Sequence, residues 1–107
     1  MAIRPYSSEE NMATLSEAEI TQGLKGLKDW NHDGQSIVKK FKFPGFPQAI
    51  EFVTKVAKLA EEVQHHPTII IAYNRVTLAF TTHSEGGLTE KDFQVAGRIE
   101  GLLSTIK

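Results

Sequence analysis

Three of the four histidines in this sequence come where a predicted strand begins or ends. His65 and His66 directly precede Pro67, and His83 follows a run rich in β-branched and apolar residues. Imidazole gains and loses a proton near neutral pH, so histidines gathered at one point are typical of acid–base chemistry. Glu61 lies four residues before His65, a helical spacing that lets a carboxylate approach an imidazole. These residues predict an acid–base site.

Two other interpretations of the histidines stay open at this point. Three histidines and a carboxylate are also zinc ligands, but adjacent residues in an extended segment point to opposite sides, which separates His65 from His66. The H-E-x-x-H spacing of zinc helices is absent, so we expect no metal. The second alternative is a structural domain in which the histidines are incidental, because His65 at a helix C-terminus gains from the helix dipole alone. His32, in a predicted hairpin turn, has no evident partner.

The elements that would position these residues can be read from periodicity and breakers. Ser16 and Glu19 form a capping-box pattern that predicts a helix over residues 17–28. A broad apolar stripe predicts a long helix over residues 48–63, and Pro67 requires it to end by about Gln64. Thr89 is a plausible N-cap for a last helix.

The strands are predicted from β-rich runs and turn signals. Asp33-Gly34 is a hairpin turn before a strand over residues 36–43. Residues 68–72 and 76–82 are predicted to form a second hairpin, with Asn74 and Arg75 as its turn. In this register Ile71 faces Leu78, and Ile69 faces Phe80. This register places His66 opposite His83, which gathers the three histidines.

The predicted order is α-β-β-α-β-β-α, which indicates a single α+β domain. We expect one four-stranded antiparallel sheet with the helices packed on one face. At 107 residues there is room for one core. Residues 1–14 are predicted to be a loose N-terminal arm, and residues 15–107 to form the domain.

Composition excludes several classes of function. The net charge of −1 gives no general attraction to nucleic acid or anionic membranes. The absence of cysteine excludes disulfides, iron–sulfur clusters and thiolate zinc sites. No apolar stretch could span a bilayer, and the N-terminus lacks the apolar core of a secretory signal. We therefore expect a cytosolic protein without membrane contact.

Several motifs together resemble the signature of the pterin-4a-carbinolamine dehydratase family. The chain has an acidic residue four positions before the first histidine of His-His-Pro, an aromatic residue six after the proline, a histidine ten after that, and an aspartate further on. The matching residues are Glu61, His65, His66, Pro67, Tyr73, His83 and Asp92. The likeness continues upstream through Trp30, Phe41 and Phe43 and covers roughly residues 15–105. The Pro44-Gly45-Phe46-Pro47 link is richer in proline than the family pattern.

The resemblance implies a fold and a reaction. The fold is a four-stranded antiparallel sheet with three helices, assembled as a dimer or a dimer of dimers. The reaction is loss of the 4a-hydroxyl from the carbinolamine made by aromatic amino acid hydroxylases, which gives quinonoid dihydropterin in tetrahydrobiopterin recycling. It needs a base near N5 and an acid for the leaving hydroxide, and it implies no cofactor.

Site residues are carried over from the same resemblance. His65 and His83 are the acid–base candidates, in either order, and His66 is a third acid–base or pterin-binding group. Glu61 would orient an imidazole or bind the pterin, Trp30 would wall the pocket, and Asp92 would support the site. For Trp30 a core position is the alternative, and for Asp92 a helix-start acid.

A rival function belongs to a different class. Some proteins that resemble this family act as a dimerisation cofactor for a homeodomain transcription factor or as an assembly chaperone for a photosynthetic enzyme. The chaperone-type relatives tend to lose the histidine set, which this chain keeps, so catalysis is favoured. A protein partner would then use the exposed face of residues 48–63 or 90–106.

Overall fold

The computed structural model of this chain describes residues 14–106. Except for Thr14, the predicted N-terminal arm lies outside the described residues. The elements are α1 (Glu17–Leu24), β2 (Asn31–Asp33), β3 (Ser36–Lys42), α2 (Phe46–Val63), β4 (Thr68–Ala72), β5 (Arg75–Phe80), the 3₁₀ turn η1 (His83–Glu85) and α3 (Glu90–Leu103).

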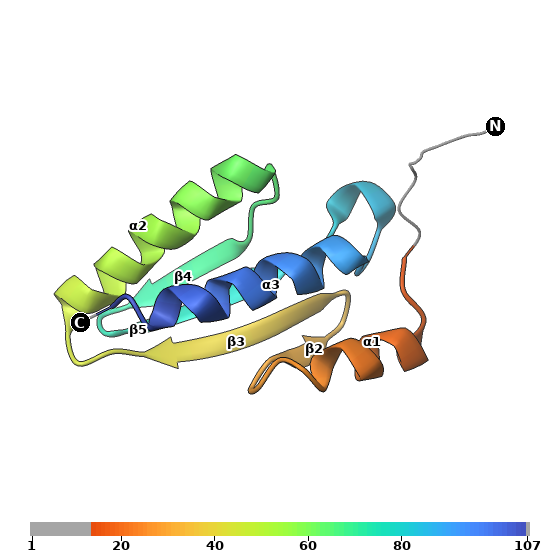
Figure 1. The fold of residues 1–107 in the computed structure, drawn as a ribbon, viewed down its shortest axis with the longest axis horizontal. Coiled ribbons are helices and arrows are strands. Elements are labelled where there is room, and N and C mark those ends of the chain that lie inside the picture. Colours follow the sequence, from red (N-terminus) through yellow and green to blue (C-terminus); the bar gives the residue numbers. More distant parts are fainter. Residues whose placement is uncertain (1–13, 107) are drawn as a thin grey trace.

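The four strands form one antiparallel sheet in the order β2-β3-β5-β4. Helices α2 and α3 lie over the same face of this sheet, and α1 lies beside β2 and β3 (Figure 1). This arrangement confirms the predicted α+β class and element order. Within residues 14–106, no helix combines the length and the apolarity needed to cross a membrane.

The core lies between the sheet and the helices. Strand β3 alternates as its sequence predicts: Ile37 and Phe41 are buried, whereas Lys40 and Lys42 are exposed on the open face. Phe52 of α2 is fully buried, and its ring centroid lies 4.8 Å from that of Phe41. This packing holds α2 against the sheet, so the end of α2 is in a fixed place.

Helix α1 is shorter than the predicted range of 17–28. Its N-terminus has the predicted capping box between Ser16 and Glu19, but the helix ends at Leu24. Gly23 and Gly26 lie at this end, and each disfavours a helix by about 1 kcal/mol relative to Ala. The chain continues in turns, although Leu27 still reaches the core.

The predicted register of the second hairpin is wrong by two residues, but its faces are right. Ile71 pairs with Val76, because the turn consists of Tyr73 and Asn74. Tyr73 takes a left-handed conformation with φ 56°, and the Asn74 side chain donates to the Phe43 carbonyl at 2.9 Å. A shift of two residues keeps each side chain on its side of the sheet.

His83 does not end a strand, and it does not lie opposite His66 in the sheet as predicted. Strand β5 ends at Phe80, and His83 begins the η1 turn. The Thr82 N–H donates to the Gly87 carbonyl at 3.1 Å, and the Gly87 N–H donates back to Thr82 at 3.3 Å. These two bonds close a loop at residues 83–86, so His83 lies in this loop and outside the β4–β5 ladder.

Candidate functional site

His65 and Asp92 form a buried pair between α2 and α3. The His65 Nε2 lies 2.5 Å from Asp92 Oδ1, and the side chains are 9% and 0% exposed. His65 is placed by the end of α2, where Gln64 adopts the left-handed conformation and the His65 N–H donates to the Ala60 carbonyl at 3.0 Å. The imidazole stacks on Phe80 with ring centroids 5.8 Å apart.

The second carboxylate oxygen of Asp92 is also fully used. Asp92 Oδ2 accepts from the Thr82 hydroxyl at 2.9 Å and from the Thr89 N–H at 3.0 Å. The Thr89 bond is part of the capping box that begins α3, so one side chain caps a helix and holds a histidine. Asp92 therefore has no surface for a ligand, and its direct partner is His65.

The Asp92 contacts join the end of α2 to the η1 loop and to the start of α3. His65 follows α2, Thr82 precedes η1, and Thr89 precedes α3. The η1 loop lies beside the start of α3 (Figure 1). His83, the residue after Thr82, is exposed, and within residues 14–106 no hydrogen bond or ion pair involves its side chain. His65 is thus a buried imidazole held by Asp92, and His83 is an exposed imidazole that follows a residue bonded to Asp92.

His66 has its own carboxylate. Its Nε2 lies 2.5 Å from Glu61 Oε2, so the imidazole that Glu61 contacts is that of His66 rather than that of His65. The two side chains are 54% and 72% exposed, so both reach solvent. An exposed pair of this kind contributes little stability, of the order of 0–1 kcal/mol.

Trp30 is in the core, where its ring packs against Phe80, the same ring on which His65 stacks. It is 4% exposed, and its ring packs edge-on to Phe41. Its Nε1–H donates to Glu100 Oε2 at 2.8 Å, and Lys39 Nζ donates to the same oxygen at 2.8 Å. The alternative of a core position therefore fits Trp30, which leaves no ring face open to a ligand.

His32 lies in β2 rather than in a turn. Its Nδ1 is 4.0 Å from Glu17 Oε1. No group of three or more His, Cys, Asp or Glu side chains in residues 14–106 is arranged to hold a metal ion.

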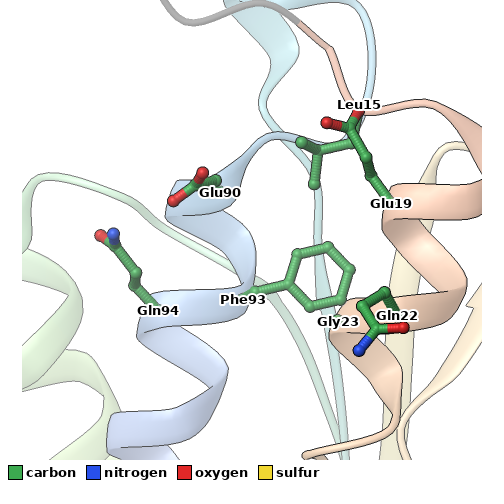
Figure 2. A pocket seen from close by; sticks show the side chains of 7 residues that line it. All are labelled: Leu15, Glu19, Gln22, Gly23, Glu90, Phe93 and Gln94. Atoms are coloured by element: carbon green, nitrogen blue, oxygen red, sulfur yellow. The ribbon is translucent and has the colours of Figure 1, made fainter.

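A separate hollow has a volume of about 440 Å³. Its lining residues come mainly from α1 and α3, which face each other in Figure 2. Phe93 points across it toward Gly23, and Glu19 and Glu90 lie at its rim. None of the predicted site residues lines this hollow. Asp92 precedes Phe93 in α3, but its side chain is directed to His65. We assign the hollow no part in the acid–base site.

Thr82 and Thr89 are the site residues that the sequence did not identify as functional. Thr89 was predicted only as an N-cap. The Thr89-x-x-Asp92 spacing is a capping box that could have revealed their bond. No local pattern signals the contact of Thr82 with Asp92, because it crosses from a loop to a helix.

The family model described as pterin 4 alpha carbinolamine dehydratase matches residues 13–102. A protein of Chloroflexus aggregans with the provisional name pterin-4-alpha-carbinolamine dehydratase is 55% identical over 93 residues, which cover 86% of this chain and 99% of the relative.

Two solved structures share the fold. A transcriptional coactivator/pterin dehydratase from Brucella melitensis is 38% identical with a TM-score of 0.80, covering 83% of this chain and 97% of its own. A pterin dehydratase-like protein described as a RuBisCO assembly factor in the alpha-carboxysome is 26% identical with a TM-score of 0.60, covering 69% and 88%. The family match spans nearly all of the described residues, and this chain belongs to the pterin 4 alpha carbinolamine dehydratase family.

Proposed function

We propose that this protein dehydrates 4a-hydroxytetrahydropterins to quinonoid dihydropterins in the recycling of tetrahydrobiopterin in the cytosol. The observation that carries the proposal is the meeting of three segments at Asp92, which holds His65 and anchors the base of the loop that bears His83. Family membership supplies the class of reaction.

The reaction is a redox-neutral elimination. The bond between C4a and its hydroxyl oxygen breaks, the N5 proton leaves, and a C4a=N5 double bond forms with release of water. One imidazole accepts the proton and another, in its protonated form, donates to the hydroxyl. Groups placed in this way contribute roughly 10²–10⁴-fold each.

The residues divide into a reacting pair and a binding pair. We assign His65 and His83 to acid–base transfer, since one is oriented by a buried carboxylate and the other is open to solvent. His66 and Glu61 form an exposed pair that can contact the pterin ring. Asp92 acts through His65, and it does not touch the substrate.

The test is the rate of dehydration of a 4a-hydroxytetrahydropterin generated by a pterin-dependent hydroxylase. We expect a rate above the spontaneous one that rises in proportion to protein concentration and saturates with substrate. A rate equal to the spontaneous one would contradict the proposal. It would favour the rival role as a binding partner, which the names of two structural relatives describe for those proteins.

We also propose self-assembly, which the exposed apolar side chains support. The exposed large apolar residues of the described chain gather at edge strand β4, its turn and the start of α2: Phe46, Ile70, Ile71 and Tyr73. An uncharged edge strand with exposed isoleucines is a template for pairing with another chain. Light scattering should show an oligomer for the wild type and a smaller species for Ile70→Lys; a monomeric wild type would contradict self-assembly. A heterologous partner would use the same patch rather than the helix faces.

A further inference from the structure

Thr82 links the two histidines that we assign to proton transfer. It is 9% exposed, and its hydroxyl donates to Asp92 Oδ2 at 2.9 Å, while Asp92 Oδ1 contacts His65. Its backbone begins the loop that bears His83. A single residue thus contacts the partner of one histidine and precedes the other.

The direction of the hydrogen bonds around Thr82 can be assigned. A hydroxyl has one proton to donate, and Thr82 gives it to Asp92. The bond of 2.9 Å between the Thr82 and Thr89 hydroxyls must then run from Thr89 to Thr82. Thr89 Oγ1 in turn accepts from the Lys91 N–H at 3.3 Å. The chain of donors ends on the carboxylate of Asp92.

This direction favours a proton on His65 Nε2. The Thr82 hydroxyl and the Thr89 N–H both donate to Asp92 Oδ2, and hydrogen bonds to a charged side chain stabilise its charged form. We therefore assign Asp92 as a carboxylate, which can only accept. The His65 proton therefore lies on Nε2, toward Asp92 Oδ1. Nδ1 has no partner within residues 14–106, which leaves this nitrogen for the exchange of a proton with a ligand.

The backbone of Thr82 also holds the loop. Thr82 exchanges two hydrogen bonds with Gly87, and its carbonyl accepts a third from the Glu85 N–H at 3.0 Å. The first residue inside this closed loop is His83. Because the side chain of Thr82 donates to Asp92, the base of the loop cannot move away from Asp92 without breaking this bond.

We propose that Thr82 is a positioning residue, whose hydroxyl keeps the His65 proton on Nε2 and fixes the place of His83 relative to His65. The effect of Thr82 on turnover rests on the proposed dehydration. Its effect on the His65 tautomer does not, because it follows from the contacts of the free protein.

The test compares Thr82→Val, which has the same shape without the hydroxyl, with Thr82→Ser, which keeps the hydroxyl. Thr81→Val, at the neighbouring position, is the control. We expect Thr82→Val to lower kcat by roughly ten- to a hundredfold, the effect of one lost hydrogen bond to a charged group. Thr82→Ser should remain within about threefold of the wild type, because the hydroxyl still donates to Asp92.

The second readout is the tautomer of His65, measured from the imidazole ¹⁵N shifts of the ligand-free protein. The wild type should show the Nε2–H form, and Thr82→Val should show a changed tautomer ratio that Thr82→Ser restores. Thr82→Ala removes the hydroxyl with less bulk and is measured in the same way if the valine variant does not fold.

The outcomes separate the positioning role of Thr82 from the proposed dehydration. An unchanged tautomer ratio in Thr82→Val and Thr82→Ala would overturn the positioning role, and so would a serine variant as impaired as the valine variant. A changed ratio in a protein that does not accelerate dehydration would leave the positioning role intact and remove the proposed function.

Discussion

His65 Nε2 and Asp92 Oδ1 lie 2.5 Å apart, although 27 positions separate the two residues in the chain. The pair joins the end of α2 to the first turn of α3, and both side chains are nearly or completely buried. A buried carboxylate bound to an imidazole orients the ring and sets its tautomer. The relationship therefore connects the packing of two helices to the chemistry of one histidine.

Replacing Asp92 by Asn should impair turnover more than stability. Asn keeps the shape and an oxygen for the Thr89 N–H, but it removes the charge that faces His65. We expect kcat to fall by roughly 10²-fold or more, since general acid–base catalysis contributes about that much. Steady-state dehydration kinetics measure this fall in kcat. Glu90→Gln, in the same helical turn but exposed, is the control and should keep wild-type kcat. Equal kcat for both variants would contradict the role of Asp92.

Replacing Glu61 by Gln should weaken substrate binding with little effect on folding. The Glu61–His66 pair is exposed, so the free energy of unfolding should change by less than about 1 kcal/mol. We expect KM to rise several-fold while kcat changes less, as found when an interaction acts equally on ground and transition states. Glu62→Gln, at the next position, is the matched control. A KM that is the same in both variants would remove Glu61 from the site.

Replacing Trp30 by Phe tests whether this residue is core or pocket wall. The change leaves Glu100 without the indole N–H, and we expect the free energy of unfolding to fall by about 1–3 kcal/mol. Because the ring is buried, KM should stay within about twofold of the wild type, well below the roughly tenfold that 1.4 kcal/mol of lost binding would give. Urea unfolding gives the free energy of unfolding, and steady-state kinetics give KM. A large rise in KM at unchanged stability would place Trp30 in the pocket.

Two glycine substitutions should differ in their effect on the free energy of unfolding. Gly97 lies inside α3 with open space around its Cα, so Gly97→Ala should stabilise the protein by about 0.5–1 kcal/mol. A Cβ on Gly23 would lie 2.9 Å from two atoms of the Phe93 ring, so Gly23→Ala should give no gain. Urea midpoints of the two variants compare them directly. An equal gain in stability for both variants would mean that the Phe93 ring moves freely away from a Cβ at position 23.

The sequence was sufficient for the fold because its patterns are local. The apolar stripe of α2 and the alternation of β3 each depend on neighbouring residues, and both elements agree with prediction. The predicted register of the second hairpin was wrong because Tyr73 adopts a left-handed conformation, which propensity alone does not favour for a tyrosine.

The structure brings several of the predicted site residues into contact, but in pairs that the sequence did not predict. The motif named His65, His66 and Asp92, whereas the choice of His66 rather than His65 as the partner of Glu61 depends on how the chain turns after α2. The role of Thr82 was missed because its contact with Asp92 forms only when the loop and α3 are packed together.

The most direct test of the account is the dehydration rate of four variants in which each histidine in turn is replaced by alanine. His83 is exposed, so its replacement should leave folding intact and still lower kcat by at least about 10²-fold, as expected for a lost acid–base group. His65→Ala should be at least as impaired, whereas His32→Ala should match the wild type. Wild-type turnover in His83→Ala and His65→Ala would contradict the histidine mechanism.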